Sequence, residues 1–160
     1  QVVFNYKNDN KKKLFNDWVK IYSNALSRGN TILNNELYLL LEQAIYNDEC
    51  LLSVAYQSKQ AIGGMLFGFN SIKADYNAAA NIPRIENEKS RGVGHLLMWE
   101  SILKLKEIKK ENLELGSFKS PNANVDINKL KNDKIENILN FKRGFGANRL
   151  LSNYFFKVLG

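Results

Sequence analysis

A glycine-rich turn that leads into an amphipathic segment is the part of this sequence best suited to chemistry. It reads Ser90-Arg91-Gly92-Val93-Gly94-His95. Glycine has no Cβ, so the backbone at Gly92 and Gly94 can fold tightly and let a bulky anion approach its N–H groups. The helix that follows adds unpaired N–H donors and the positive end of its dipole. With Lys89 and Arg91 beside it, the turn predicts a phosphate-binding site; the alternative is an ordinary turn before a buried helix.

Other residue types that carry chemistry are sparse. Cys50 is the only cysteine, so it can form no intrachain disulfide and is expected to be a small buried hydrophobe. His95 is the only histidine; a general-base role is possible, but its place at a helix start favours a structural or capping role. Tyr76, on the strand before the turn, is expected to pack. No pattern for a covalent nucleophile or for a metal site stands out, so we expect no metal.

Length and composition predict one domain. The 160 residues, 44% of them hydrophobic, suffice for one sizeable core over residues 1–160. No segment is long and apolar enough for a membrane span or a signal peptide, which predicts a soluble, cytoplasmic protein. The net charge of +7 is diffuse and would suit a nucleotide, a tRNA or an anionic lipid-linked substrate. Because the chain begins with Gln1, we expect a processed product or part of a longer protein.

Hydrophobic periodicity predicts a mixed α/β (α+β) fold around the turn. Apolar spacing predicts helices over 9–30, 35–47, 94–110 and 133–140, and strands over 1–6, 50–56, 61–69, 71–80, 112–118 and 149–159. The strand at 112–118 follows a crossover helix and should have a parallel neighbour. Three glycines inside the strand at 61–69 predict a bulge or a closely packed surface. The polar segment 119–132 is expected to be a mobile loop. Together these elements form a sheet of six or seven strands.

Two motifs in the C-terminal half resemble the GNAT acyltransferase superfamily, and within it the branch of Fem-type aminoacyl transferases and FemAB-like acetyltransferase domains. Lys89-Ser90-Arg91-Gly92-Val93-Gly94 is similar to the donor turn of that superfamily, with Lys in place of the usual Gln or Arg. Leu113-Glu114-Leu115-Gly116-Ser117 resembles the strand that follows, where Asp is more usual than Glu114. Phe141-Lys142-Arg143-Gly144-Phe145-Gly146 is the most specific match. Fem-type enzymes carry two such domains, so this chain would be one half of a tandem or a stand-alone version.

The resemblance implies a mostly antiparallel sheet with helices on both faces and a central splayed parallel pair of strands that holds the donor's pantetheine arm. The donor would be acyl-coenzyme A, bound at Lys89, Arg91, Gly92, Val93, Gly94 and His95. An amine acceptor, small or peptide-like, would attack it directly.

The resemblance also assigns catalytic roles. Lys142 would stabilise the developing oxyanion, and Glu114 would accept the amine proton. Phe141, Arg143 and Ser117 would contact substrate. The backbone at Phe141-Lys142, between the helix over 133–140 and Gly144, should bend sharply, with Phe141 and Phe145 packed into the core or against the donor. Each catalytic residue has a structural alternative: Lys142 as a surface or ion-paired lysine, Glu114 as an outward strand carboxylate. The competing functions are an aminoacyl-tRNA-dependent transferase for a cell-wall precursor and a non-catalytic basic module that binds nucleic acid or a membrane.

Overall fold

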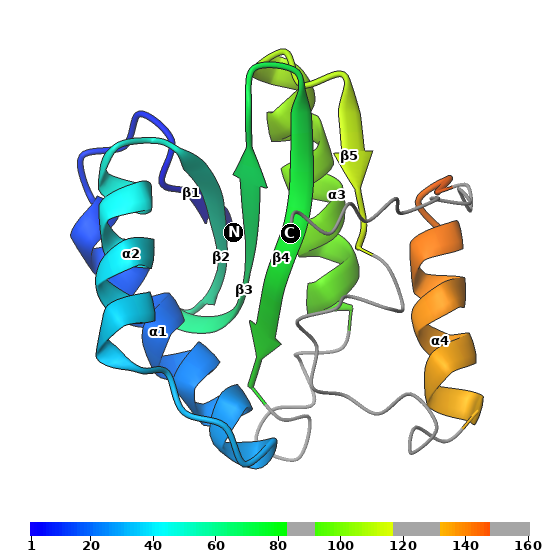
Figure 1. Cartoon of the computed structure of the whole chain (residues 1–160), viewed down its shortest axis with the longest axis horizontal. Helices are drawn as coiled ribbons and strands as arrows, with labels where there is room; N and C mark the ends of the chain where they lie inside the picture. The colour runs from blue at the N-terminus through cyan, green and yellow to red at the C-terminus, as the bar shows by residue number, and fades with distance from the viewer. Residues whose placement is uncertain (83–91, 117–131, 148–160) are drawn as a thin grey trace, which may run out of the picture. The chain divides into compact units, whose positions relative to one another are not determined.

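The computed structural model describes residues 1–82, 92–116 and 132–147 (Figure 1). The chain divides into two compact units, Gln1–Ser117 and Phe118–Gly160, and each is described by itself. The elements are, in chain order, β1 (Val2–Phe4), α1 (Lys11–Arg28), α2 (Asn35–Tyr46), β2 (Cys50–Gln57), β3 (Gln60–Phe69), β4 (Lys73–Asn81), α3 (Val93–Glu107), β5 (Asn112–Glu114) and α4 (Asn132–Arg143). Within these ranges, no helix combines the length and apolar character of a membrane span.

The first unit is a single five-stranded sheet in the order β1-β2-β3-β4-β5. Strands β1 to β4 form an antiparallel meander, whereas β5 pairs with β4 in parallel. The strand that follows the crossover helix α3 therefore has a parallel neighbour, as the sequence predicted. The described residues hold five strands and not six or seven. The remaining expected strand, at 149–159, lies outside the described residues. So does the expected loop at 119–132, except for Asn132, which begins α4.

Helices cover both faces of the sheet, as expected (Figure 1). On one face, α1 buries Leu14, Phe15 and Trp18 against Leu52 and other side chains of the meander. This burial follows from the apolar spacing along α1. On the other face, α3 contacts β2, β3 and β4. A buried hydrogen bond from the Ser101 hydroxyl to the Ser53 hydroxyl, 2.9 Å long, joins α3 to β2.

The glycines of β3 allow both a bulge and close packing. Ala55 pairs with Gly63 and Tyr56 with Ala61, so β3 carries an extra residue between them. A Cβ on Gly64 would lie 2.5 Å from Trp18 Cδ1 and 3.0 Å from the Ser53 carbonyl oxygen. Because both groups are buried, only glycine fits there.

A polar cluster ties α1 to β2. The Tyr56 hydroxyl donates to Asp17 Oδ2 at 2.8 Å, and Lys13 Nζ donates to the same oxygen at 2.6 Å. Burial, reinforced by the bond to Asp17, raises the pKa of Tyr56 to about 12. Burial alone would raise the pKa of Asp17, but the hydrogen bonds from Lys13 and Tyr56 outweigh it and lower that pKa.

In the second unit, α4 extends further than the sequence predicted. The sequence predicted a helix over 133–140 that ends in a bend at Phe141. The observed helix continues through Arg143. Lys and Arg are good helix formers, and the chain leaves the helix only at Gly144, whose N–H donates to the Asn140 carbonyl at 2.9 Å. The predicted bend at Phe141-Lys142 is therefore wrong, because both residues lie in the last turn of a helix.

Candidate donor-binding site

The glycine turn has the geometry of an open helix start. Gly92 is the N-cap of α3 and adopts a left-handed conformation with φ of 85°, which a residue with a side chain rarely adopts. Gly92 supplies no side-chain cap, and the first turn of α3 contains no acidic residue. The first N–H groups of an α-helix have no partner within the helix itself, and such groups can bind an anion. His95 is exposed and is the third residue of α3, and its expected structural or capping role stays a prediction.

The start of α3 packs at the carboxyl end of β4. A Cβ on Gly63 would lie 2.9 Å from Val93 Cγ1 and would also collide with Asn81 Oδ1. Arg28, in the last turn of α1, reaches the same place and donates to the Asn81 carbonyl at 3.4 Å. The sequence did not predict this contact, because no local pattern links residues 53 positions apart. The carboxyl end of a strand beside a helix N-terminus is where open α/β sheets bind ligands.

Strands β4 and β5 pair over a short stretch only. Their ladder joins Lys73 to Asn112 and ends at Asp75 and Glu114, while β4 continues to Asn81. Gly116, with φ of 74°, turns the chain close to the Tyr76 carbonyl just past the end of the ladder.

A bulge in β4 lies next to this point. Phe67 pairs with Tyr76 but Leu66 pairs with Ala78, so Asn77 is an extra residue in β4. The bulge redirects the backbone near the end of the ladder. No sequence pattern had marked Asn77.

Glu114 is held in an ion-pair cluster. Lys73 Nζ lies 2.5 Å from Glu114 Oε2 and 2.9 Å from Asp75 Oδ1. The hydrogen bonds to these two carboxylates raise the pKa of Lys73, and the bond to Glu114 contributes most. Burial acts in the opposite direction. This arrangement matches the alternative for Glu114, an outward strand carboxylate, and its role as proton acceptor stays a prediction.

The predicted catalytic lysine lies in the second unit. Lys142, in the last turn of α4, is half-buried, and burial lowers its pKa. The rings of Phe141 and Phe145 meet edge to face with centroids 5.2 Å apart. Arg143 is exposed. Lys89, Arg91 and Ser117 lie outside the described residues.

The described titratable groups include no activated nucleophile. Cys50 is buried, and burial raises the pKa of its thiol to about 12, which keeps it protonated and inert. Tyr76 packs with its ring centroid 5.7 Å from that of Phe67, and burial raises its pKa. Across the described ranges, no three His, Cys, Asp or Glu side chains gather as metal ligands would.

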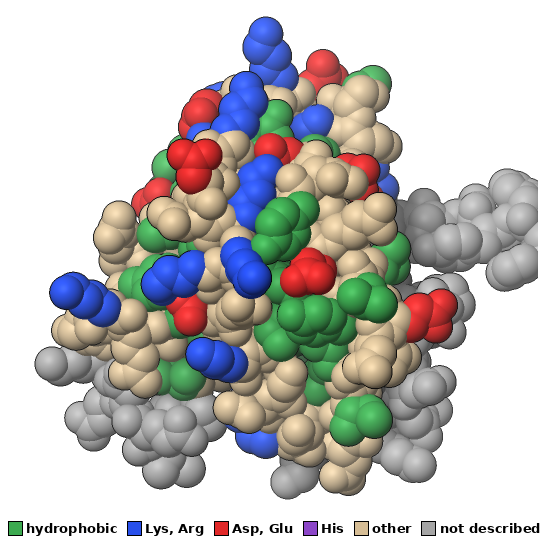
Figure 2. Space-filling view, turned by 90° about the vertical axis from the view of Figure 1, so that its left-hand side faces the viewer, with side chains coloured by type: hydrophobic (Ala, Val, Ile, Leu, Met, Phe, Trp, Pro, Cys, Tyr) green, Lys and Arg blue, Asp and Glu red, His purple; other side chains and the backbone are tan. Residues whose placement is uncertain are grey.

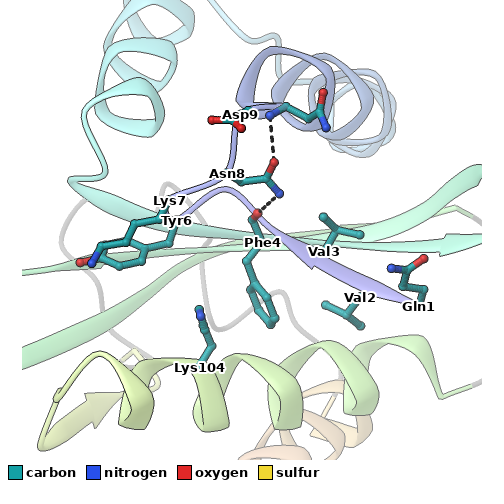
Figure 3. Close-up of a pocket in the computed structure, with 10 residues that line it drawn as sticks. Gln1, Val2, Val3, Phe4, Tyr6, Lys7, Asn8, Asp9 and Lys104 are labelled. Atoms are coloured by element: carbon teal, nitrogen blue, oxygen red, sulfur yellow. Dashed lines mark hydrogen bonds between the residues drawn. The ribbon is translucent and has the colours of Figure 1, made fainter.

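A groove of about 440 Å³ lies elsewhere, beside the edge strand β1 (Figure 3). It is lined by β1, by the turn that follows and by Lys104 of α3. Asn8 closes part of the strand edge, since its Nδ2 donates to the Phe4 carbonyl at 2.8 Å. None of the predicted site residues lines this groove.

Several solved structures with the same fold are acetyltransferases, although no family model and no curated protein sequence matches the chain. An aminoglycoside acetyltransferase, meta-AAC0020, from an uncultured soil metagenomic sample aligns with a TM-score of 0.65 and 12% identity, over 99% of this chain and 96% of that one. Ribosomal-protein-alanine N-acetyltransferase from Brucella melitensis gives 0.61 and 9%, over 99% of both chains. Aminoglycoside 6'-N-acetyltransferase AAC(6')-Ih from Acinetobacter baumannii gives 0.60 and 15%, over 100% and 99%.

The structural alignments concern the whole fold on which the candidate site is built. The alignments span nearly the whole of each chain, so the likeness concerns the complete architecture and not one motif. None of them supports the Fem-type branch in particular. The chain therefore has the fold of the GNAT acetyltransferases, the superfamily that its glycine turn resembles.

Proposed function

We propose that the chain is an N-acyltransferase that moves an acyl group from acyl-coenzyme A to a primary amine. One observation carries the proposal. The amino end of α3 begins at the left-handed Gly92, which supplies no side-chain cap, and lies at the carboxyl end of β4 in a fold shared with acetyltransferases. An anion bound there would meet N–H donors and the positive end of the helix dipole, with no acidic residue of the first turn to oppose it.

The described residues fit the donor. The N–H groups of Val93, Gly94 and His95 would hold its pyrophosphate, with Lys89 and Arg91 adding charge. Among the described residues, none places an atom within 4 Å of a Cβ built on Gly92. The part of β4 beyond the β5 ladder, Tyr76–Asn81, spans about 20 Å at about 3.3 Å per residue. An extended pantetheine arm laid along it would reach from α3 to the end of the ladder.

The chemistry proposed is direct attack by the amine. The amine nitrogen bonds to the acyl carbon, the carbon–sulfur bond breaks, and the amine loses one proton. Lys142 would stabilise the negative charge on the carbonyl oxygen, because an ammonium shielded from water favours the oxyanion over the ground state. Glu114, directly or through water, would take the proton if its ion pair with Lys73 opens. Phe141, Arg143 and Ser117 would contact the acceptor.

The acceptor proposed is a small or peptide-like amine. Among the structural neighbours, one is in complex with sisomicin and another is a ribosomal-protein-alanine N-acetyltransferase. Transfer from aminoacyl-tRNA to a cell-wall precursor is the second candidate, and the motif at Phe141–Gly146 favours it.

An acyl-transfer assay tests the proposal. The full chain is incubated with acetyl-coenzyme A and a panel of amines that includes aminoglycosides and peptides with free N-termini, and the released thiol is measured. Amine-dependent thiol release is the expected result. Absence of acetyl-coenzyme A binding, together with salt-dependent binding of tRNA, would instead support the tRNA-dependent transferase or the non-catalytic basic module.

A further inference from the structure

Arg28 is a positive charge that the fold brings to the candidate donor site from a distant part of the sequence. It lies in the last turn of α1, and its Nη2 donates to the carbonyl of Asn81, the last residue of β4, at 3.4 Å. Asn81 in turn lies against the first residue of α3, because its Oδ1 and Val93 Cγ1 are 2.2 and 2.9 Å from the position that a Cβ on Gly63 would take. Figure 1 shows the end of α1 near the end of β4. The Arg28 guanidinium therefore lies beside the residues that position the amino end of α3.

The contact with Asn81 uses little of the hydrogen-bonding capacity of Arg28. A guanidinium has several N–H donors in one plane, and this single bond is longer than the usual range of about 2.7–3.2 Å. The end of α1 does not depend on the Arg28 side chain as a cap, because the N–H groups of Gly29 and Asn30 bond to carbonyls of the last turn. Most of the guanidinium donors can therefore bind an incoming anion.

Among the described residues, Arg28 has no carboxylate partner, unlike two lysines of the same helix. Lys11 pairs with Asp48 at 2.8 Å and Lys13 with Asp17 at 2.6 Å. Figure 2 shows the side of the molecule that carries α1 and α2, where Lys and Arg side chains lie among Asp and Glu. No described carboxylate lies within ion-pair distance of Arg28, and the first turn of α3 adds none. The charge of Arg28 is therefore left to attract an anion.

We propose that Arg28 binds a phosphate of the acyl donor and so favours a phosphorylated donor. The inference rests on the proposed function, and it adds a ligand from α1 to a site at the start of α3. A guanidinium can bind phosphate through two parallel N–H···O bonds, which fix the orientation of the phosphate as well as its place. Coenzyme A carries phosphate at two places, in the pyrophosphate and on the ribose. The chemistry of recognition is the same for both.

Calorimetric titration of the full chain with coenzyme A tests the inference. Arg28→Gln should weaken binding by about tenfold or more, the scale of a lost hydrogen bond to a charged group. Arg28→Lys keeps the charge but not the paired donors, so its affinity should lie between those of Arg28→Gln and wild type. A higher salt concentration should narrow the difference between wild type and Arg28→Gln, because salt screens an exposed charge. Circular dichroism checks that the variants are folded.

Lys12→Gln is the matched control. Lys12 is exposed on the same helix and lies about 24 Å from Arg28 along the helix axis, so its replacement makes the same change of net charge far from the site. The affinity of Lys12→Gln for coenzyme A should stay within about twofold of wild type.

Dephospho-coenzyme A, which lacks the ribose phosphate, identifies the phosphate that Arg28 binds. A loss in Arg28→Gln that is the same with both ligands assigns the pyrophosphate, and a loss that disappears with dephospho-coenzyme A assigns the ribose phosphate. Equal affinities of Arg28→Gln and Lys12→Gln for coenzyme A would overturn the inference and leave the proposed function standing. So would an equal loss in Arg28→Gln and Arg28→Lys that salt does not change, because the side chain would then only support the end of β4. No binding of coenzyme A by the wild type would overturn both.

Discussion

A negative charge at His95 tests the donor site through two effects of opposite sign. His95 is exposed, is the third residue of α3 and lies in a first turn that has no acidic residue. In His95→Asp, the new carboxylate faces the positive end of the helix dipole and should stabilise the fold by about 0.3–1 kcal/mol. The same carboxylate would repel a bound pyrophosphate. Stability and donor affinity should therefore change in opposite directions.

The expected loss of affinity follows from the charges. Two unit charges about 6 Å apart repel by about 0.7 kcal/mol at a dielectric constant of about 80 and by about 2.8 kcal/mol at about 20. A pyrophosphate with about two charges doubles these values to about 1.4–5.6 kcal/mol, which corresponds to an affinity at least about tenfold weaker.

Calorimetric titration with acetyl-coenzyme A measures the affinity, and urea unfolding measures the stability. The control Leu103→Asp adds the same charge about 12 Å further along the helix axis, beyond the screening length of about 10 Å at about 0.1 M salt. Its affinity should match that of the wild type. An unchanged affinity in His95→Asp, with raised stability, would show that the helix end senses the charge but holds no phosphate, and would refute the reasoning.

Three further variants test the fold and the chemistry. Gly64→Ala should destabilise the protein by about 1–3 kcal/mol in urea unfolding, because its Cβ would lie 2.5 Å from Trp18 Cδ1, whereas Gly29→Ala, with no atom nearer than 3.4 Å, should not. Asp17→Asn should lower the melting temperature at pH 7, and the difference from wild type should shrink as the pH falls below about 4, because the pKa of Asp17 is lowered in the fold. Lys142→Met should reduce turnover about a hundredfold with little change in donor affinity.

Each of these predictions has a result that contradicts it. Equal effects of Gly64→Ala and Gly29→Ala would show that the interior around Trp18 yields to an added methyl group. For Asp17→Asn, a difference in melting temperature that stays constant from pH 7 to pH 3 would mean that the carboxylate form contributes nothing. For Lys142→Met, a change no greater than that of Lys12→Met, an exposed lysine of α1, would make Lys142 a structural residue.

The sequence predicted the elements of the first unit because their signals are local. Apolar spacing located α1 and α2 within a few residues of their observed ends, and the strand–turn–helix–strand order predicted the parallel pairing of β4 with β5. The glycines of β3 correctly predicted close packing. They did not predict that Trp18 is the residue that packs there. A pattern shows that a strand has no room for a side chain; it does not show which distant residue fills the space.

Features that join distant parts of the chain could not be predicted. The ion pair of Lys73 with Glu114 spans 41 positions, so alternation along β5 left both roles of Glu114 open. The bulge at Asn77 depends on pairing with β3 and leaves no mark in the composition of β4. The end of α4 was misplaced for a different reason: Gly144 and Gly146 suggested a bend at Phe141-Lys142, but the helix formers before Gly144 extend the helix to Arg143.

A crystal structure of the full chain with coenzyme A tests the central claim most directly. The account predicts electron density for the pyrophosphate within hydrogen-bond distance of the N–H groups of Val93, Gly94 or His95 at the start of α3. Density for the pyrophosphate at another place, such as the groove beside β1, or none at a saturating concentration of coenzyme A, would contradict it.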